Sequence, residues 1–169
     1  MLVTMGVNQV EVFISMTRRW IIILFSGIFS SILFLPSCKD SSNVTEQIPT
    51  GPINLIIDLN LGTYQHLSNV GEFAYVEGGV KGVLIIHDYD DAWYAFERSC
   101  AYQPTKNCSK IWVDTANIQL RCGEQLIGSF TECCNSKYMF SGLPTSGMAK
   151  GRLARYNIQR DGNILQIYN

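Results

Sequence analysis

The sequence from Ile53 to Asn169 predicts an all-β domain, an antiparallel sandwich or small barrel. Its apolar residues come in short runs that are rich in β-branched and aromatic side chains, the composition of strands. Gly, Asn or Asp bounds these runs, which is typical of tight turns. No segment in this region sustains a helical period over three turns. Just under 120 residues suffice for one domain with a buried core.

The expected strands follow one another at the spacing of a sandwich. In chain order they are Ile53–Leu59, Gly82–His87, Trp93–Phe96, Ile111–Val113, Ile118–Arg121, Gln125–Phe130, Ala154–Gln159 and Ile164–Tyr168. Residues 88–91, Asp-Tyr-Asp-Asp, predict a hairpin turn between the second and third strands. Asp161, Gly162 and Asn163 predict a tight hairpin before the last strand.

The first 37 residues read as an export signal and are excluded from the fold. Residues 16–19 are basic, and Trp20 to Leu35 form an apolar run of signal-peptide length, short for a membrane span. Residues 35–38, Leu-Pro-Ser-Cys, resemble the lipobox of bacterial lipoproteins, in which the cysteine receives the lipid. We therefore expect lipid attachment at Cys38 and a true start at Met16.

Residues 38–52 are short, polar and rich in turn-forming residues, and they predict a flexible tether between the lipid and the domain at 53–169. The resemblance to lipoproteins implies a bacterial cell envelope, with the domain outside the cytoplasm and the outer membrane as the expected membrane. Oxidising conditions there favour disulfide bonds.

The charge of the chain beyond Cys38 argues against a nucleic-acid partner. This part contains 11 Lys and Arg residues against 13 Asp and Glu residues. A net charge of about −2 gives no basic surface for a phosphate backbone. The expected partners are the membrane, through the lipid anchor, and a protein that the sequence does not identify.

The second half of the domain follows a motif that reads His-Gly-Ser-x-Phe, then Gly, then Ser-Gly-Pro-Ala. With Cys134 at the His position, Asn135-Ser136 stand on Gly-Ser and Tyr138 on Phe. The same register sets Gly142 on the glycine and residues 146–149, Ser-Gly-Met-Ala, on the last part of the motif. This segment resembles the second cluster-binding loop of Rieske iron-sulfur proteins. Residues 98–102, Arg-Ser-Cys-Ala-Tyr, are similar to the first loop, and the likeness covers most of 79–169.

This resemblance is greatest to Rieske-like lipoproteins of the Bacteroidetes group. It implies a Rieske-like antiparallel sandwich with a small cluster-binding-type subdomain made of two hairpin loops. A [2Fe-2S] centre of this family uses two thiolates and two imidazoles, from Cys-x-His and Cys-x-x-His.

The ligand positions implied by the resemblance are mostly substituted. Cys100 matches the first thiolate, whereas Tyr102, Thr131 and Cys134 stand where His, Cys and His are expected. A second register that starts at Cys122 also lacks the imidazole. His66 and His87 are the two histidines of the chain, and we expect His87 to lie at a strand edge or turn instead of binding metal. The sequence therefore predicts no cofactor and no metal, with an atypically ligated [2Fe-2S] cluster as the alternative.

The resemblance also implies how the cysteines pair. Respiratory Rieske proteins brace their loops with a disulfide at the places that Cys108 and Cys133 occupy, so this pair is expected first. Cys100 and Cys134 would face each other across the vacant cluster site and close a second bond if their Cα atoms came within about 7 Å. Cys122 is then left over and is expected to be buried as a small apolar residue.

Other roles for the two loops remain open at the level of sequence. Four loop cysteines can be a plain scaffold, or Cys100, Cys108, Cys133 and Cys134 could form a four-thiolate site for zinc or an iron-sulfur cluster. Cys100 and Cys134 could instead work as a redox pair. A further option is a contact surface made of aromatic residues around the old cluster mouth, namely Tyr102, Trp112, Tyr138 and Phe140.

Conventional catalysis finds little support in the residues. Neither histidine assembles into a Ser-His-Asp arrangement, and no glycine-rich loop opens a helix. The turn carboxylates Asp88, Asp90 and Asp91 are expected to be solvated. We therefore expect a lipid-anchored, disulfide-braced, non-catalytic binding or structural module, with a [2Fe-2S] electron carrier as the alternative.

Overall fold

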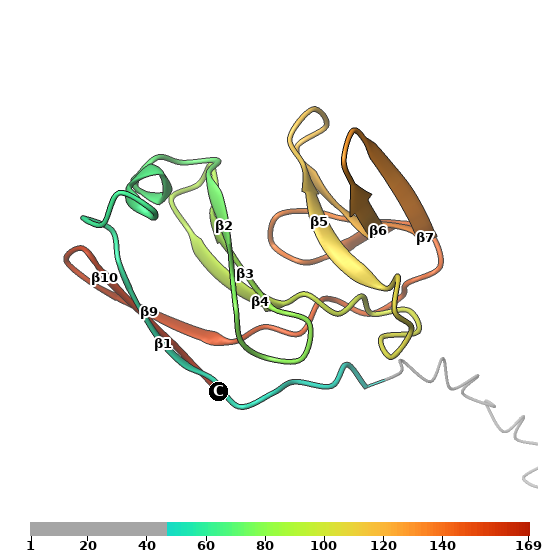
Figure 1. The fold of residues 1–169 in the computed structure, drawn as a ribbon, viewed down its shortest axis with the longest axis horizontal. Coiled ribbons are helices and arrows are strands. Elements are labelled where there is room, and N and C mark those ends of the chain that lie inside the picture. Colours follow the sequence, from blue (N-terminus) through green and yellow to red (C-terminus); the bar gives the residue numbers. More distant parts are fainter. Residues whose placement is uncertain (1–46) are drawn as a thin grey trace, which may run out of the picture. The chain divides into compact units, whose positions relative to one another are not determined.

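The computed structural model describes residues 47–169, and these form an all-β unit (Figure 1). The expected lipid-attachment residue Cys38, the signal segment 1–37 and most of the tether lie outside the described residues. Among residues 47–169, no helix is long and apolar enough to cross a membrane.

Ten strands and one short 3₁₀ helix make up this unit. They are β1 (Asn54–Asp58), η2 (Gln65–Ser68), β2 (Phe73–Val76), β3 (Val83–His87), β4 (Trp93–Glu97), β5 (Lys110–Asp114), β6 (Gln119–Leu126), β7 (Ser129–Tyr138), β8 (Pro144–Ser146), β9 (Asn157–Asp161) and β10 (Ile164–Tyr168).

The strands form three antiparallel sheets that lie side by side in Figure 1. The first sheet has the order β1-β10-β9, the second β2-β3-β4, and the third β5-β6-β7-β8. All the pairings are antiparallel, as the sequence predicted. The chain returns from the third sheet to the first, so β10 pairs with β1 and joins the two ends of the domain.

Strand β3 contributes side chains to both of the apolar clusters that hold the three sheets together. Every residue of β3 is buried, because the strand is in the middle sheet and has neighbours on both faces. Val83 and Ile85 point into one apolar cluster, and Leu84 and Ile86 point into another. This is the alternation that a strand imposes on successive side chains.

The two clusters lie on opposite sides of the middle sheet. One joins it to the first sheet through Ile57, Tyr156, Leu165 and Ile167. The other joins it to the third sheet and contains side chains of both predicted loops. Its members from the third sheet and the loops are Cys100, Ala101, Ile111, Leu120, Cys122, Tyr138, Phe140, Ala149 and Leu153.

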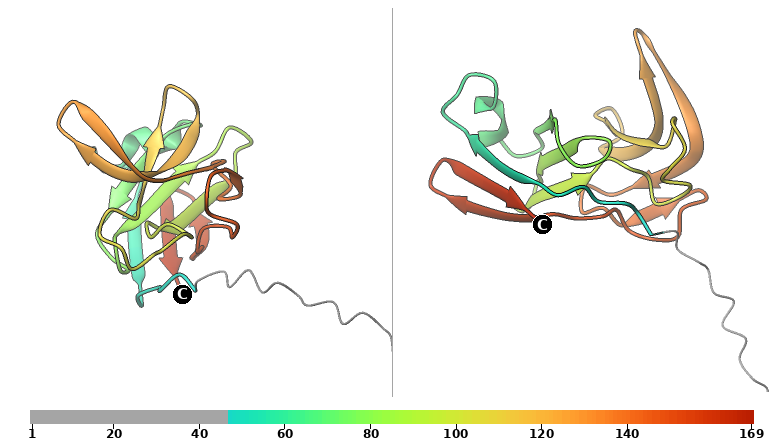
Figure 2. Two further views of the ribbon diagram at one scale, coloured as in Figure 1. Left: turned by 90° about the vertical axis from the view of Figure 1, so that its right-hand side faces the viewer. Right: turned by 60° about the horizontal axis from the view of Figure 1, so that its bottom comes forward.

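Strands β6 and β7 form a long hairpin that extends away from the rest of the domain (Figure 2). At its tip Leu126 pairs with Ser129, and Ile127 and Gly128 make the turn. The predicted strand Gln125–Phe130 is therefore wrong, because its apolar run is interrupted by this two-residue turn. Ile127 is fully exposed at the tip, so its apolar character does not reflect burial in the domain.

The other predicted strands are found with small shifts. The last two appear as β9 and β10, although β9 begins only at Asn157. Residues Ala154 to Tyr156 still reach the middle sheet, since Glu97 N donates to Ala154 O and Tyr156 N donates to Ala95 O. Strands β2 and β8, and the part of β7 beyond Phe130, were not expected from the sequence.

Candidate functional site

Three free thiols come together where the two predicted loops meet. Cys100 follows β4, Cys122 lies in β6 and Cys134 lies in β7. Their Sγ atoms all lie within 4.8 Å of one another, and those of Cys100 and Cys134 are 3.6 Å apart. Cys100 and Cys122 are buried, and Cys134 is partly accessible. The site is therefore a small, mostly enclosed sulfur cluster.

A bulge between β6 and β7 brings the Cys134 thiol into this cluster. Arg121 pairs with Lys137, and Gly123 pairs with Glu132, so Cys122 alone faces the residues from Cys133 to Ser136. The extra residues bend β7 out of the regular ladder, as bulges do next to functional sites. This excursion carries Cys134 to Cys100.

Neighbouring polar groups hold the thiols in place. The Cys100 sulfur lies 3.3 Å from Tyr138 Oη and accepts a long hydrogen bond of 3.5 Å from Tyr102 N. The Cys134 thiol donates to Ser136 Oγ over 3.1 Å. Cys122 Sγ lies 3.8 Å from Ser109 Oγ. Each sulfur thus has a polar partner apart from the other thiols.

These contacts make the three thiols electrostatically unequal. Hydrogen bonding from Cys122, with further contributions from Tyr138, lowers the pKa of Cys100 to about 5, although burial acts in the opposite direction. The pKa of Cys122 is raised, first because it is hydrogen-bonded to Cys100 and then because it is buried. Burial followed by the charge of Cys100 also raises the pKa of Tyr138. These hydrogen bonds therefore favour a negative charge on Cys100 over one on Cys122.

The expected disulfide between Cys108 and Cys133 is formed, with a Cα–Cα distance of 5.6 Å. It ties the loop after Cys100 to β7, directly before Cys134. A four-thiolate site with Cys100, Cys108, Cys133 and Cys134 is not compatible with this bond, because it consumes two of the four sulfurs.

The second expected disulfide is absent from the structure. Cys100 and Cys134 are free thiols whose sulfur atoms are 3.6 Å apart, against about 2.05 Å in a disulfide. The Cys134 thiol donates a hydrogen bond to Ser136 Oγ instead, and Cys122 shares the site with both cysteines. Sequence reasoning expected Cys122 to be a buried apolar residue outside the site, and no motif in the chain marked it as a member of the sulfur cluster.

The ligand positions of the Rieske resemblance do not converge into a [2Fe-2S] site. Tyr102 lies next to Cys100 and offers its backbone N–H to that sulfur. Thr131 is exposed and pairs with Glu124 in the projecting hairpin. Such a centre needs two imidazoles, and this donor set supplies thiols alone. The residues present do not fit the cluster.

Both histidines are engaged elsewhere. His87 is buried at the end of β3, with Nδ1 2.9 Å from Leu67 O and Nε2 2.7 Å from the turn carboxylate of Asp91. Its ring stacks on Trp93. His66 Nε2 lies 3.0 Å from Phe73 O. His87 is thus turn-facing, as expected, although it is more buried than an edge residue.

The second loop has the contacts that its motif requires. Asn135, at the position of a glycine in the Rieske motif, has a positive φ of 51°. A Cβ atom on Gly147 would collide with the Asn135 backbone, which explains why this position needs a glycine. Ser136 Oγ accepts a 2.9 Å hydrogen bond from Ala149 N. These contacts fold the chain after β8 over the sulfur cluster.

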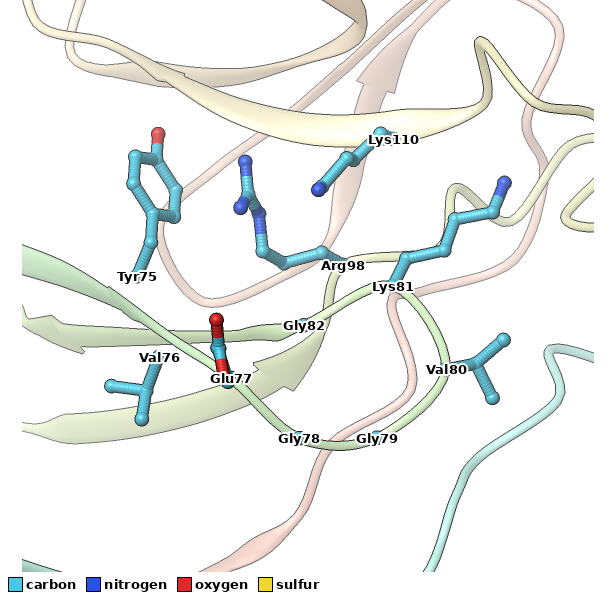
Figure 3. Close-up of a pocket in the computed structure, with 10 residues that line it drawn as sticks. All are labelled: Tyr75, Val76, Glu77, Gly78, Gly79, Val80, Lys81, Gly82, Arg98 and Lys110. Atoms are coloured by element: carbon cyan, nitrogen blue, oxygen red, sulfur yellow. The ribbon is translucent and has the colours of Figure 1, made fainter.

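A pocket of about 370 Å³ lies between the 77–82 loop and β5, and Figure 3 shows its lining residues. Arg98 is its central cation, with the guanidinium carbon 3.8 Å from the Tyr75 ring centre and 4.2 Å from that of Trp112. Burial lowers the pKa of Arg98 to about 10. Lys81 Nζ donates to the carbonyl oxygens of Lys106 and Ser109. Arg98 Nε donates to Ile111 O, whereas Arg98 Nη2 is buried without a hydrogen-bond partner among the described residues. The pocket therefore joins two sheets and keeps one guanidinium nitrogen unpaired.

The aromatic residues expected around the old cluster mouth divide into two groups. Tyr138 and Phe140 are buried in the core. Tyr102 and Trp112 are half-buried, and the Trp112 ring is occupied by Arg98 and by a hydrogen bond from Nε1 to Gly123 O. Exposed apolar side chains in this region come instead from Met139, Leu143 and Met148.

Comparison with known proteins gives similarity to solved structures. No protein-family model and no curated protein matches the chain. Among solved structures, the fold is similar to the ferredoxin of carbazole 1,9a-dioxygenase from Nocardioides aromaticivorans IC177, with a TM-score of 0.43 and 14% identity. The match covers 70% of this chain and 97% of that chain. At this identity the similarity assigns no activity.

Proposed function

We propose that this chain is a lipid-anchored binding module of the bacterial cell envelope and that it is not a Rieske electron carrier. In this proposal Cys38 carries the lipid, the domain lies outside the cytoplasm, and the outer membrane is its expected place. The Cys108–Cys133 disulfide braces the two loops.

The observation that carries the proposal is the chemistry of the donor set. Two cysteines, a tyrosine and a threonine stand at the four ligand positions where two thiolates and two imidazoles would be needed, and the threonine is exposed outside the sulfur cluster. Without imidazole ligands, the mixed nitrogen and sulfur coordination of a Rieske centre cannot be assembled from Cys100, Tyr102, Thr131 and Cys134.

The surroundings of the histidines and carboxylates support a non-catalytic role. Each histidine has a ring nitrogen within hydrogen-bonding distance of a backbone carbonyl, and the second ring nitrogen of His87 contacts Asp91. Glu97 is buried and surrounded by donors, so it is committed to the fold. Neither histidine lies in a nucleophile-base pair of the kind that acyl transfer uses.

The disulfide and the exposed apolar residues support a role outside the cytoplasm in contact with a protein. Disulfides persist in oxidising compartments and are rare in the cytosol. Met139, Leu143 and Met148 are exposed near the second loop, and flexible methionine side chains suit adaptable contacts.

The test is to purify the full-length chain from membranes and to measure iron, acid-labile sulfide and the paramagnetic spectrum after reduction. We expect less than stoichiometric iron and no paramagnetic signal. A brown preparation with two irons per chain and a signal on reduction would establish the alternative, an electron carrier with unorthodox ligands.

The membrane part of the proposal is tested separately with Cys38→Ala. We expect this variant to lose lipidation and to leave the membrane fraction or remain uncleaved, whereas wild type stays in the membrane fraction. Equal lipidation and fractionation of variant and wild type would contradict the anchor.

A further inference from the structure

We propose that Cys100, Cys122 and Cys134 form a three-sulfur site for one soft monovalent metal ion, with Cu(I) as the ion of matching chemistry. This inference rests on the proposed function, because it names what the binding module takes. It adds Cys122, which the Rieske resemblance did not place in the site.

The spacing of the sulfur atoms suits one ion bound by all three. A metal-sulfur distance of about 2.3 Å places the sulfur atoms of a trigonal site about 4.0 Å apart. The three Sγ atoms already lie within 4.8 Å of one another, and those of Cys100 and Cys134 are 3.6 Å apart. Side-chain rotations that move each sulfur atom by less than about 1 Å would give the trigonal arrangement, so no backbone movement is needed.

The donor set selects the kind of ion. Thiolates are soft ligands, and they favour Cu(I), zinc or iron-sulfur clusters over hard cations. Structural zinc is almost always four-coordinate. Within residues 47–169 no histidine or carboxylate joins the three sulfurs. Three sulfur ligands without a fourth donor fit a monovalent ion that accepts trigonal coordination.

The surroundings are arranged as outer contacts of a metal site. Tyr138 Oη and Tyr102 N approach the Cys100 sulfur, Ser109 Oγ approaches Cys122, and Ser136 Oγ approaches Cys134. Such contacts fix the orientation of metal ligands and moderate their charge.

Lys81 places positive charge beside the site. Its Nζ donates to Ser109 O over 2.9 Å, and Ser109 in turn contacts Cys122. A thiol that coordinates loses its proton to solvent, so binding adds negative sulfur charge around a single positive ion. A held ammonium group lowers the cost of that excess charge.

The site also has a rigid frame and an entrance. Cys100 and Cys122 are buried in the core, whereas Cys134 is partly accessible and lies directly after the disulfide-bonded Cys133. An ion would therefore enter past Cys134 and be enclosed by the other two sulfurs. The Cys108–Cys133 bond keeps the entrance residue in place.

The experiment titrates the full-length chain, purified in detergent without oxygen or added thiols, with Cu(I) against a coloured Cu(I) chelator. We expect one Cu(I) per chain, an ultraviolet thiolate-to-copper absorption and three sulfur neighbours by X-ray absorption. Cu(I) at 100 times its dissociation constant should raise the unfolding midpoint by about 10 °C.

Three variants separate the proposed ligands from bystanders. Cys122→Ala should weaken Cu(I) binding by more than the roughly 10- to 100-fold that loss of an outer contact costs, and leave two sulfur neighbours. Cys134→Ser, at the most accessible of the three positions, should give the same loss with less effect on folding. Thr131→Ala, at an old ligand position outside the site, should bind Cu(I) as wild type does.

Equal Cu(I) affinity in Cys122→Ala and wild type would overturn the proposal, as would a failure of the reduced chain to bind. A Cys100–Cys134 disulfide in protein trapped with iodoacetamide at lysis would also overturn it. If the protein contains no iron, any of these results leaves the proposed function intact. Iron with a paramagnetic signal contradicts the proposed function itself.

Discussion

At the scale of single residues, Glu97 shows how one buried charge organises a loop. Its carboxylate is fully buried and accepts hydrogen bonds from Val80 N at 2.7 Å, Lys81 N at 2.9 Å, Ser99 Oγ at 3.2 Å and Tyr156 Oη at 2.9 Å. A buried carboxylate is tolerated when its oxygens are hydrogen-bonded in this way. Glu97 therefore fixes the loop between β2 and β3, and with it one wall of the Arg98 pocket.

Replacing Glu97 tests this role. Glu97→Ala should lower the free energy of unfolding by at least about 3 kcal/mol, because it leaves several buried donors without an acceptor. Chemical denaturation measures the change. Tyr156→Phe, which removes one donor and no acceptor, should cost only about 1 kcal/mol. A Glu97→Ala domain as stable as Tyr156→Phe would show that solvent replaces the carboxylate.

For Cys122, the sequence predicted burial but not its place in the sulfur cluster. The sequence predicts that it is buried, and only 1% of its surface is exposed. Its approach to Cys100 and Cys134 was not predicted, because it depends on the register between β6 and β7. That register is set by a bulge of several residues, which periodicity does not reveal. The Cys108–Cys133 bond, by contrast, was expected from the family resemblance alone.

At the scale of elements, the domain depends on close packing between the second loop and the chain that follows β8. Gly147 has a φ of +91°, and a Cβ atom there would meet the backbone of Asn135. Gly162, in the last hairpin, has a φ of +56° and open space around it. A side chain at Gly162 would therefore meet backbone strain alone, whereas one at Gly147 would meet the same strain and a steric clash.

These glycines give a matched pair of variants. Gly162→Ala should cost about 1 kcal/mol through its left-handed backbone alone. Gly147→Ala should cost about 2 to 4 kcal/mol, because the same strain is joined by a clash with a backbone that cannot yield easily. Thermal unfolding of both variants measures the difference. Equal costs would mean that the loop after β8 moves freely away from Asn135.

The strands show which elements sequence patterns can find. Dense apolar runs bounded by turn residues located β1, β3, β4 and β10, since their side chains are buried in the two cores. The pattern failed at Gln125–Phe130, where the exposed residues Leu126 and Ile127 were assigned to a strand interior, although Leu126 ends β6 and Ile127 is in the turn. β2 was missed, because it has only four residues and a single buried one among them.

At the scale of the whole molecule, two cores share the middle sheet, and the Cys108–Cys133 disulfide closes a separation of 25 residues across the third sheet. Such a bond stabilises mainly by restricting the unfolded chain, by roughly 2 to 4 kcal/mol. The all-β antiparallel class was predictable because strand periodicity is local. The convergence of three sheets was not, because it depends on contacts far apart in the sequence.

The contribution of the disulfide can be measured with the double variant Cys108→Ser, Cys133→Ser. We expect the unfolding midpoint to fall by roughly 10 °C, and dithiothreitol to lower the midpoint of wild type by a similar amount. The double variant should not respond to dithiothreitol. A further drop in that variant would show that Cys100 and Cys134 are also bonded.

The adjacency of Cys133 and Cys134 has a consequence for biosynthesis. The free thiol of Cys134 can attack the Cys108–Cys133 disulfide by thiol–disulfide exchange. Attack at the Cys108 sulfur would give a Cys108–Cys134 bond and release Cys133 as a thiol. Oxidative folding of this protein then needs a step that discriminates between adjacent sulfurs, by an isomerase or by prior occupation of Cys134. Disulfide isomers with Cys108 bonded to Cys134 should accumulate when the chain refolds in a glutathione buffer with no isomerase and with Cys134 unoccupied.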